Sequence, residues 1–152
     1  MNTAIKNIIR VVSLIICFSF VFTAMAASDW YVDQINGSND NDGQTAGTAK
    51  QTIQAAVDSA SSGDVIKVAE GIYQDVNTTY NGISACVIIT NKNLTIVATG
   101  AKEKTHIVGR HADTDIGVGA GAVRCVYVKD DCERTVRIEG FTIRDGDRKS
   151  VV

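Results

Sequence analysis

The sequence predicts an all-β fold, a solenoid of parallel strands with one amino-terminal capping α-helix. Beyond residue 63 the hydrophobic period is two residues, in many short strands rich in Val and Ile. The same order of three strands occurs twice, and the connecting loops differ in length. An antiparallel sandwich is the competing architecture, but neither Asn36-Gly37 nor Asn81-Gly82 stands between two strands at hairpin distance.

Residues 1–26 have the pattern of a cleavable signal peptide. Lys6 and Arg10 precede the apolar run from Val11 to Phe22, and Ala24-Met25-Ala26 is a small-x-small site of the kind that a signal peptidase accepts. The run is shorter than the roughly 20 residues that a membrane-spanning helix needs. We therefore expect a secreted or cell-surface protein that keeps no membrane span after cleavage.

Residues 27–63 are expected to hold an entry strand, a loop and the capping helix. The strand covers Trp30 to Asp33, and Gly, Asn and Asp residues favour a loop from Asn36 to Gly47. Thr48 and Gln51 fit a capping box at the start of the helix. Gly63 is expected to end it. The apolar residues between these signals recur at helical spacing, and they are Ile53, Ala56, Val57 and Ala60.

Residues 64–152 are expected to form the first turns of the solenoid. Inward side chains should stack in columns, and Asn91 and Gly140 should turn corners with positive φ. The expected strands are Asp64–Val68, Ile72–Gln74, Cys86–Thr90, Leu94–Ala98, His106–Gly109, Arg124–Val128, Thr135–Ile138 and Phe141–Arg144. The expected columns are Val65, Leu94 and Val136 on one face, and Ile72, Ile107 and Ile143 on another.

No carboxy-terminal cap follows the last expected strand. An uncapped turn of a solenoid exposes open backbone groups and aliphatic side chains. We therefore expect a fragment, truncated at its carboxy end, that self-associates through the uncapped end.

An ordered series of motifs resembles the amino-terminal portion of the pectin-lyase-like right-handed parallel β-helix superfamily, which includes pectate lyases and pectin methylesterases. The motifs are Gly37-Ser38-Asn39-Asp40 with Asp42-Gly43, Lys50 to Val57, Gly63 to Val68 with Glu70 to Tyr73, Asn93 to Ile96, and Gly140 to Ile143. The resemblance implies a right-handed parallel β-helix. It also implies a parent protein that binds or cleaves an acidic or neutral polysaccharide.

The resemblance carries over no catalytic residue, because no position matches the Gly-Asp-Phe-type motif of the methylesterases. Catalytic residues of a polysaccharide lyase, esterase or glycoside hydrolase would then lie beyond this chain, and the expected fragment has no complete active site. Two alternatives stay open: a carbohydrate-active enzyme such as a pectin methylesterase or polysaccharide lyase, and a cell-surface adhesin or structural β-helix. Residues of the types that lyases use, without matching context, are Arg144, Asp145, Asp147 and Arg148.

Composition argues against a nucleic-acid partner. The chain has 17 Asp and Glu against 15 Lys and Arg, so it offers no excess of positive charge for a phosphate backbone. Aromatic residues make up only 6%, too few to suggest a stacking platform for single strands.

The polar motifs point to structural roles rather than to a cofactor. Ser38, Asp40, Asp42 and Gly43 look like the first half of a calcium loop, and calcium is the one cofactor these oxygens could hold. The closing ligand of such a loop would fall on Ala49, so a loop-capping role is favoured. Titratable residues without a visible mechanism are His106, His111, the pair Asp113 and Asp115, and the pair Asp130 and Asp131.

The cysteines suggest no zinc site, because no CxxC motif or Cys/His cluster occurs. Cys86 and Cys125 occupy equivalent places on successive expected turns. They are therefore expected to form either a disulfide between turns or a buried column of thiols, while Cys132 stays free.

Overall fold

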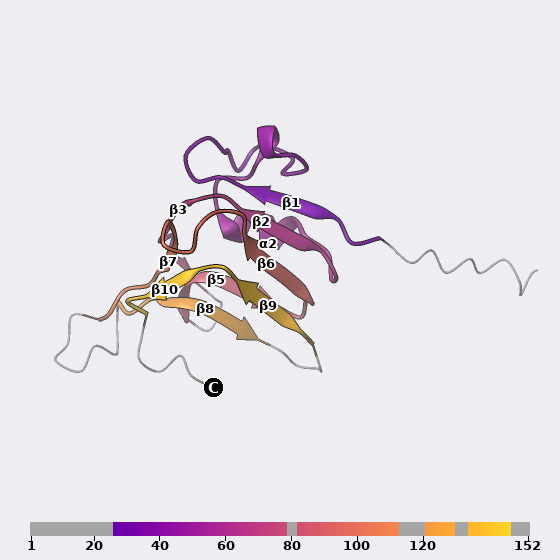
Figure 1. Ribbon diagram of the computed structural model, residues 1–152. Helices are drawn as coiled ribbons and strands as arrows, with labels where there is room; N and C mark the ends of the chain where they lie inside the picture. Colours follow the sequence, from indigo (N-terminus) through magenta and orange to yellow (C-terminus); the bar gives the residue numbers. More distant parts are fainter. Residues whose placement is uncertain (1–25, 79–81, 113–120, 130–133, 147–152) are drawn as a thin grey trace, which may run out of the picture.

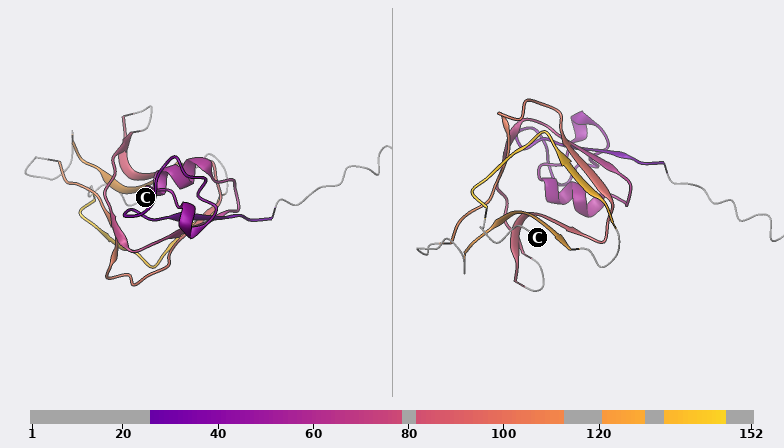
Figure 2. Two further views of the ribbon diagram at one scale, coloured as in Figure 1. Left: turned by 90° about the horizontal axis from the view of Figure 1, so that it is seen from above. Right: turned by 60° about the horizontal axis from the view of Figure 1, so that its bottom comes forward.

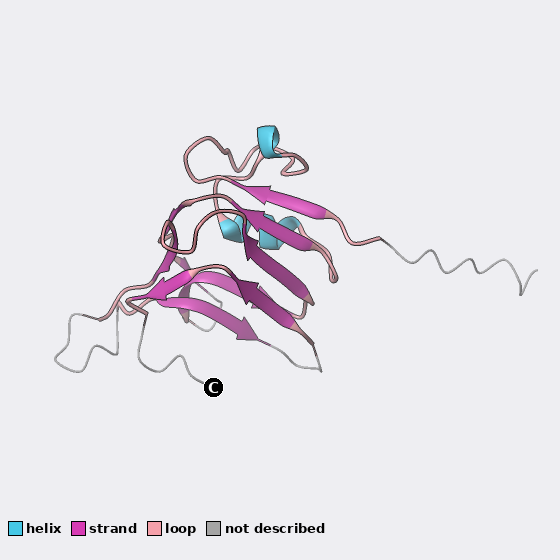
Figure 3. Cartoon of the chain, viewed as in Figure 1, coloured by secondary structure: helices cyan, strands magenta, loops and turns pink. Residues whose placement is uncertain are grey.

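The computed structural model describes residues 26–78, 82–112, 121–129 and 134–146. The regular structure of the described chain is mostly β-strand, with one α-helix and one short 3₁₀ helix (Figure 3). In chain order the elements are β1 (Asp29–Val32), η1 (Ala46–Thr48), α2 (Ile53–Ser59), β2 (Val65–Val68), β3 (Gly71–Tyr73), β4 (Asn77–Thr78), β5 (Ser84–Thr90), β6 (Leu94–Ala98), β7 (Thr105–Val108), β8 (Arg124–Lys129), β9 (Val136–Glu139) and β10 (Thr142–Arg144).

The strands form three sheets, which we name A, B and C (Figure 1). Sheet A has the order β1-β2-β6-β9, sheet B the order β3-β7-β10, and sheet C the order β4-β5-β8. Neighbouring strands are parallel in every pair except β4–β5, which is antiparallel. Seen from above, the sheets lie around a common interior (Figure 2).

The predicted solenoid, the right-handed parallel β-helix, is wrong as a description of this fold. The described strands lie in three short, separate sheets of four, three and three strands rather than in a stack of equivalent rungs. A helix follows β1 where a rung would place two more strands, and β4 turns back antiparallel on β5. The recurring strand order in the sequence therefore does not correspond to a uniform repeat.

The predicted side-chain columns are confirmed for two pairs, because Leu94 is the register partner of Val136 and Ile107 is the register partner of Ile143. The first member of each column is displaced by one residue. Val65 is paired with Thr95, so Val65 does not lie beside Leu94. The buried residue of β2 is instead Ile66, which is the register partner of the buried Ile96. Because side chains alternate between the two faces of a strand, a slip of one residue exchanges inside for outside.

In sheet B the first member of the predicted column, Ile72, is displaced in the same way. Ile72 is 44% exposed and is paired with His106 on the outer face. Tyr73 and Ile107 fill the interior at 1% exposure each. The Tyr73 hydroxyl donates to the carbonyl of Ala69 at 3.0 Å, so the ring is buried without leaving its polar end unpaired.

Helix α2 packs its buried residues, Ile53, Ala56 and Val57, against the interior and contacts β1, β2 and β5. Its N-cap is Thr52, whose hydroxyl accepts a hydrogen bond from the amide of Ala55. The expected capping box at Thr48 is therefore wrong. Asn39 reaches across from the preceding loop, and its side-chain oxygen accepts from the amides of Gln51 and Thr52 at 3.0 Å each.

The corners behave as predicted at two positions. Asn91 has φ of 51° and Gly140 has φ of 77°. Gly63 also has a positive φ of 101°, but α2 ends earlier, at Ser59.

A buried carboxylate joins the first strand to the rest of the core. Asp64 is 6% exposed, and it accepts hydrogen bonds from the amide of Ser28 at 2.8 Å, the indole of Trp30 at 2.9 Å and the amide of Ser61 at 2.8 Å. Burial raises the pKa of Asp64, but these three hydrogen bonds outweigh it and leave the pKa below its usual value. Asp64 thus fixes β1 beside β2 and the turn after α2.

Candidate functional site

A cavity of about 340 Å³ lies where sheet B meets sheet C. Its walls come from three separate parts of the chain: the segment after β3, the end of β7 and the residue before β8. The lining residues are Gln74, Val76, Val108, Gly109, Arg110 and Val123. The volume falls at the lower end of the range of small-molecule sites, and the lining combines three valines with the polar side chains of Gln74 and Arg110.

A short antiparallel bridge forms one wall of the cavity. The amide of Arg110 donates to the carbonyl of Val123 at 2.9 Å, and the amide of Val123 donates back to Arg110 at 2.7 Å. Gly109 allows this close approach, because a Cβ atom there would lie 2.4 Å from the Val123 carbonyl oxygen. Glycine at this position is therefore a packing requirement.

The polar side chains of the lining offer hydrogen-bond donors from Arg110, and both a donor and an acceptor from Gln74. The Arg110 side chain is anchored through Nε, which donates to the carbonyl of Gly121 at 3.1 Å. Its two terminal nitrogens and the Gln74 amide make no hydrogen bond with the residues that the structure describes. A guanidinium with two unpaired nitrogens matches the two oxygens of a carboxylate.

A buried thiol supports the same wall from inside. The Cys86 sulfur donates to the carbonyl of Val108 at 3.0 Å. The Cys125 sulfur donates to the carbonyl of Arg144 at 3.2 Å, and Arg144 is the register partner of Val108. Each thiol of sheet C therefore holds the end of one strand of sheet B.

Of the two alternatives for these cysteines, the structure has the free thiols. Their neighbours pair in register between β5 and β8, so the two cysteines lie on adjacent strands about one interstrand spacing, roughly 4.8 Å, apart. Burial raises the pKa of Cys86 to about 12, and electrostatic repulsion from Cys125 adds a smaller contribution. Burial also raises the pKa of Cys125. Cys132 lies outside the described residues.

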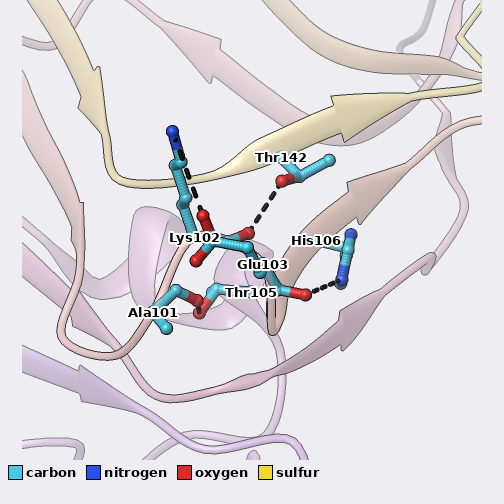
Figure 4. A network of polar contacts seen from close by, with 6 residues as sticks. All are labelled: Ala101, Lys102, Glu103, Thr105, His106 and Thr142. Atoms are coloured by element: carbon cyan, nitrogen blue, oxygen red, sulfur yellow. Dashed lines mark hydrogen bonds and ion pairs between the residues drawn. The ribbon is translucent and has the colours of Figure 1, made fainter.

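His106 lies in β7, where its ring contacts the preceding turn, and it does not line the cavity (Figure 4). Its Nε2 atom lies 2.8 Å from the carbonyl of Glu103, and its Nδ1 atom is buried with no partner among the described residues. The hydroxyls of Thr105 in β7 and Thr142 in β10 donate to two carbonyls of the same turn, those of Ala101 and Lys102, at 3.0 and 2.7 Å. These contacts tie β10 to the turn before β7. The other histidine, His111, is exposed.

The loop residues expected to cap or to bind calcium form hydrogen bonds within the loop. The Ser38 hydroxyl accepts from the amide of Asp40, at 3.3 Å. The Asp42 carboxylate accepts from the amide of Gln44 at 3.0 Å and from the hydroxyl of Thr48 at 2.6 Å, and these contacts lower the pKa of Asp42. Asp42 thus stabilises the loop directly. Among the described residues, no group of three or more His, Cys, Asp or Glu side chains is placed to hold a metal ion.

The acidic and basic residues with lyase-like types are only partly described. Arg144 and Asp145 form an ion pair with each other at 2.7 Å, and both side chains are half exposed. Asp147 and Arg148 lie outside the described residues, as do both expected aspartate pairs, which are Asp113 and Asp115, and Asp130 and Asp131.

Sequence reasoning missed the cavity because its lining residues are far apart in the chain. Arg110 belongs to no motif of the sequence, and Gln74 appeared only as the end of an expected strand. Asp64 was also missed, although a carboxylate directly after Gly63 and before a buried strand is a local signal that could have been used.

No protein family model, curated protein or solved structure matches the chain. The resemblance to the pectin-lyase-like superfamily therefore stays a prediction. In the part of the chain that the structure describes, no helix has the length and apolar character needed to cross a membrane.

Proposed function

We propose that the chain is an exported polysaccharide-binding protein whose cavity between sheets B and C holds an acidic sugar unit. The observation that carries this proposal is the lining of the cavity, where the guanidinium of Arg110 and the amide of Gln74 stand beside three valines. A sugar acid offers a carboxylate and hydroxyls to the donors, and the C–H face of its ring to the valines. The signal-peptide pattern of residues 1–26 agrees with an extracellular ligand.

The proposed activity is binding rather than cleavage. The described lining contains no carboxylate, imidazole or thiolate that could act as a general acid or base. The Cys86 thiol lies behind the wall and has a pKa raised to about 12, so it stays protonated at physiological pH.

Calorimetric titration with oligogalacturonides tests the proposal. We expect saturable binding that weakens with added salt, because the contact with Arg110 is electrostatic. Carboxyl-reduced oligosaccharides of the same length should bind at least about tenfold more weakly, since a charge-assisted hydrogen bond contributes about 1.5–3 kcal/mol.

Matched variants locate the site. Arg110→Gln keeps a polar side chain but removes the charge, and it should lower the affinity by about tenfold or more. Lys104→Gln removes an exposed cation outside the cavity and should leave the affinity unchanged. Equal binding by wild type and Arg110→Gln would exclude the cavity.

The same samples test the enzyme alternative. Incubation with polygalacturonan and with methylated pectin, followed for unsaturated products and released methanol, should show neither. Turnover that survives in Arg110→Gln would assign an activity to another part of the chain and overturn the proposal.

A further inference from the structure

Among the residues that the structure describes, three sheet edges and part of the apolar interior are left open at one end. The last strands of sheets A, B and C are β9, β10 and β8, and they lie together at the bottom of Figure 1. At the inward positions, Ile107 is 1% exposed whereas its register partner Ile143 in β10 is 53% exposed. Ile89 is 0% exposed whereas its partner Val128 in β8 is 44% exposed.

The opposite end is covered by its own loop. The amide of Tyr31 in β1 donates to the carbonyl of Gly43, and the amide of Lys50 donates to the carbonyl of Tyr31. At the open end the structure describes a strand partner on only one side of β8, β9 and β10. An unpaired, partly apolar edge is a template for another strand.

The backbone of β9 faces outward at Val136 and Ile138. The amide of Leu94 donates to the carbonyl of Thr135, which places the odd-numbered residues of β9 toward β6. In a parallel ladder the alternate residues direct their N–H and C=O groups to the other side. Ile138 can therefore pair with Ile138 of a second strand by two reciprocal N–H···O bonds.

The side chains of β9 are self-complementary about the same point. In an antiparallel pair centred on Ile138, Arg137 lies opposite Glu139 of the other strand, and Glu139 lies opposite its Arg137. These are non-hydrogen-bonded positions, where cross-strand side chains are closest. Within one copy Arg137 Nε donates to Glu139 Oε1 at 2.7 Å, and both side chains are exposed on the outer face.

We propose that β9 is the centre of a two-fold interface with a second copy of this chain, formed by antiparallel pairing across Ile138. A self-complementary strand is what an isologous dimer requires, because the same patch meets itself. The pairing would also bring the exposed apolar side chains of the neighbouring edge strands under cover. This inference is independent of the proposed sugar site, which lies between sheets B and C.

Charge reversal tests the register of this interface by sedimentation equilibrium, from micromolar to submillimolar protein. Wild type should show a monomer–dimer equilibrium. Arg137→Glu places glutamates opposite each other, and Glu139→Arg places arginines opposite each other, at two symmetric contacts. Each variant alone should raise the dimer dissociation constant by at least about tenfold.

Mixing the two single variants is the decisive arm. One chain then carries two glutamates and the other two arginines, so every cross-strand pair is again opposite in charge, and a heterodimer should form. Lys102→Glu, an exposed reversal in the turn before β7, is the matched control and should associate like wild type. Circular dichroism confirms that each variant is folded.

Two results would overturn the proposal. One is a wild-type protein that stays monomeric over the whole concentration range. The other is a wild-type dimer together with a mixture of the reversed variants that fails to associate, since this would place the interface elsewhere.

Discussion

Asp64 provides the sharpest test of how this core is held together. Its carboxylate accepts from three donors, Ser28, Trp30 and Ser61, at 2.8–2.9 Å. Asp64→Asn keeps the shape of the side chain but leaves a single acceptor oxygen. Its new amide group faces N–H donors, so at least one buried donor loses its partner.

The cost follows from the number of bonds that change. Hydrogen bonds to charged groups contribute about 1.5–3 kcal/mol each, and a buried unsatisfied donor costs about 1–3 kcal/mol. We expect Asp64→Asn to lower the free energy of unfolding by about 2–4 kcal/mol at pH 7. That is a large fraction of the about 5–15 kcal/mol available to a typical domain.

The effect depends on pH with a defined sign. The pKa of Asp64 is lower in the folded protein than its usual value of 3.8, so the stabilisation is fully present above that value. It is lost as the pH falls through the lower pKa of the folded state. The difference between wild type and Asp64→Asn should therefore shrink in strong acid.

Urea unfolding followed by the fluorescence of Trp30, the single tryptophan, measures the difference directly. Asp40→Asn is the matched control, because it makes the same substitution on an exposed loop carboxylate. A loss below about 0.5 kcal/mol at pH 7, or an equal loss at every pH, would refute the role assigned to the buried carboxylate.

Two further predictions concern the interior. Ile66→Ala should cost about 2–5 kcal/mol in urea unfolding because Ile66 is fully buried, whereas Ile72→Ala should cost under about 1 kcal/mol because Ile72 lies on the outer face. A larger loss of stability from Ile72→Ala than from Ile66→Ala would contradict the observed register and favour the side-chain columns predicted from the sequence. Cys86 and Cys125 should resist a thiol reagent at pH 8 in the native protein, since burial raises both pKa values, and both should react after unfolding under non-reducing conditions. Peptide mapping would contradict the free thiols if it found the two joined.

The sequence alone predicted the strands well because their signal is local. Leu94–Ala98 was predicted with its observed bounds, and the other main strands with ends within about two residues. Alternation of Val and Ile needs no knowledge of the partner strand. The two-residue strand β4 and the 3₁₀ helix were missed, because neither has enough residues to show a period.

The arrangement of the strands was harder to predict. A repeated strand order suggested equivalent rungs, and the structure has three short sheets of unequal strand number instead. The column error has a different cause, because aliphatic residues occupy adjacent positions in Val65-Ile66 and Ile72-Tyr73. Either member of such a pair could face inward, so the hydrophobic pattern did not fix the register.

The candidate site could not be predicted, because it depends on contacts between distant segments. Gln74 and Arg110 carry no motif, and the glycine between Val108 and Arg110 is required by backbone atoms of Val123 and Gly146, which are distant in the sequence. The loop role of Asp42, in contrast, rests on neighbours within six residues, and it was within reach of local reasoning.

The order of strands within the sheets determines how the folded chain comes apart. In sheet A the pairings run from β1 to β2, β6 and β9 in sequence order, and none joins the first strand directly to the last. Separation of β9 removes cross-strand bonds from β6 alone and leaves the β1–β2 ladder intact. Local opening of β9 and β10 therefore need not spread to the rest of the molecule. Amide protons of β1 and β2 can remain protected while those of β9 and β10 exchange with solvent.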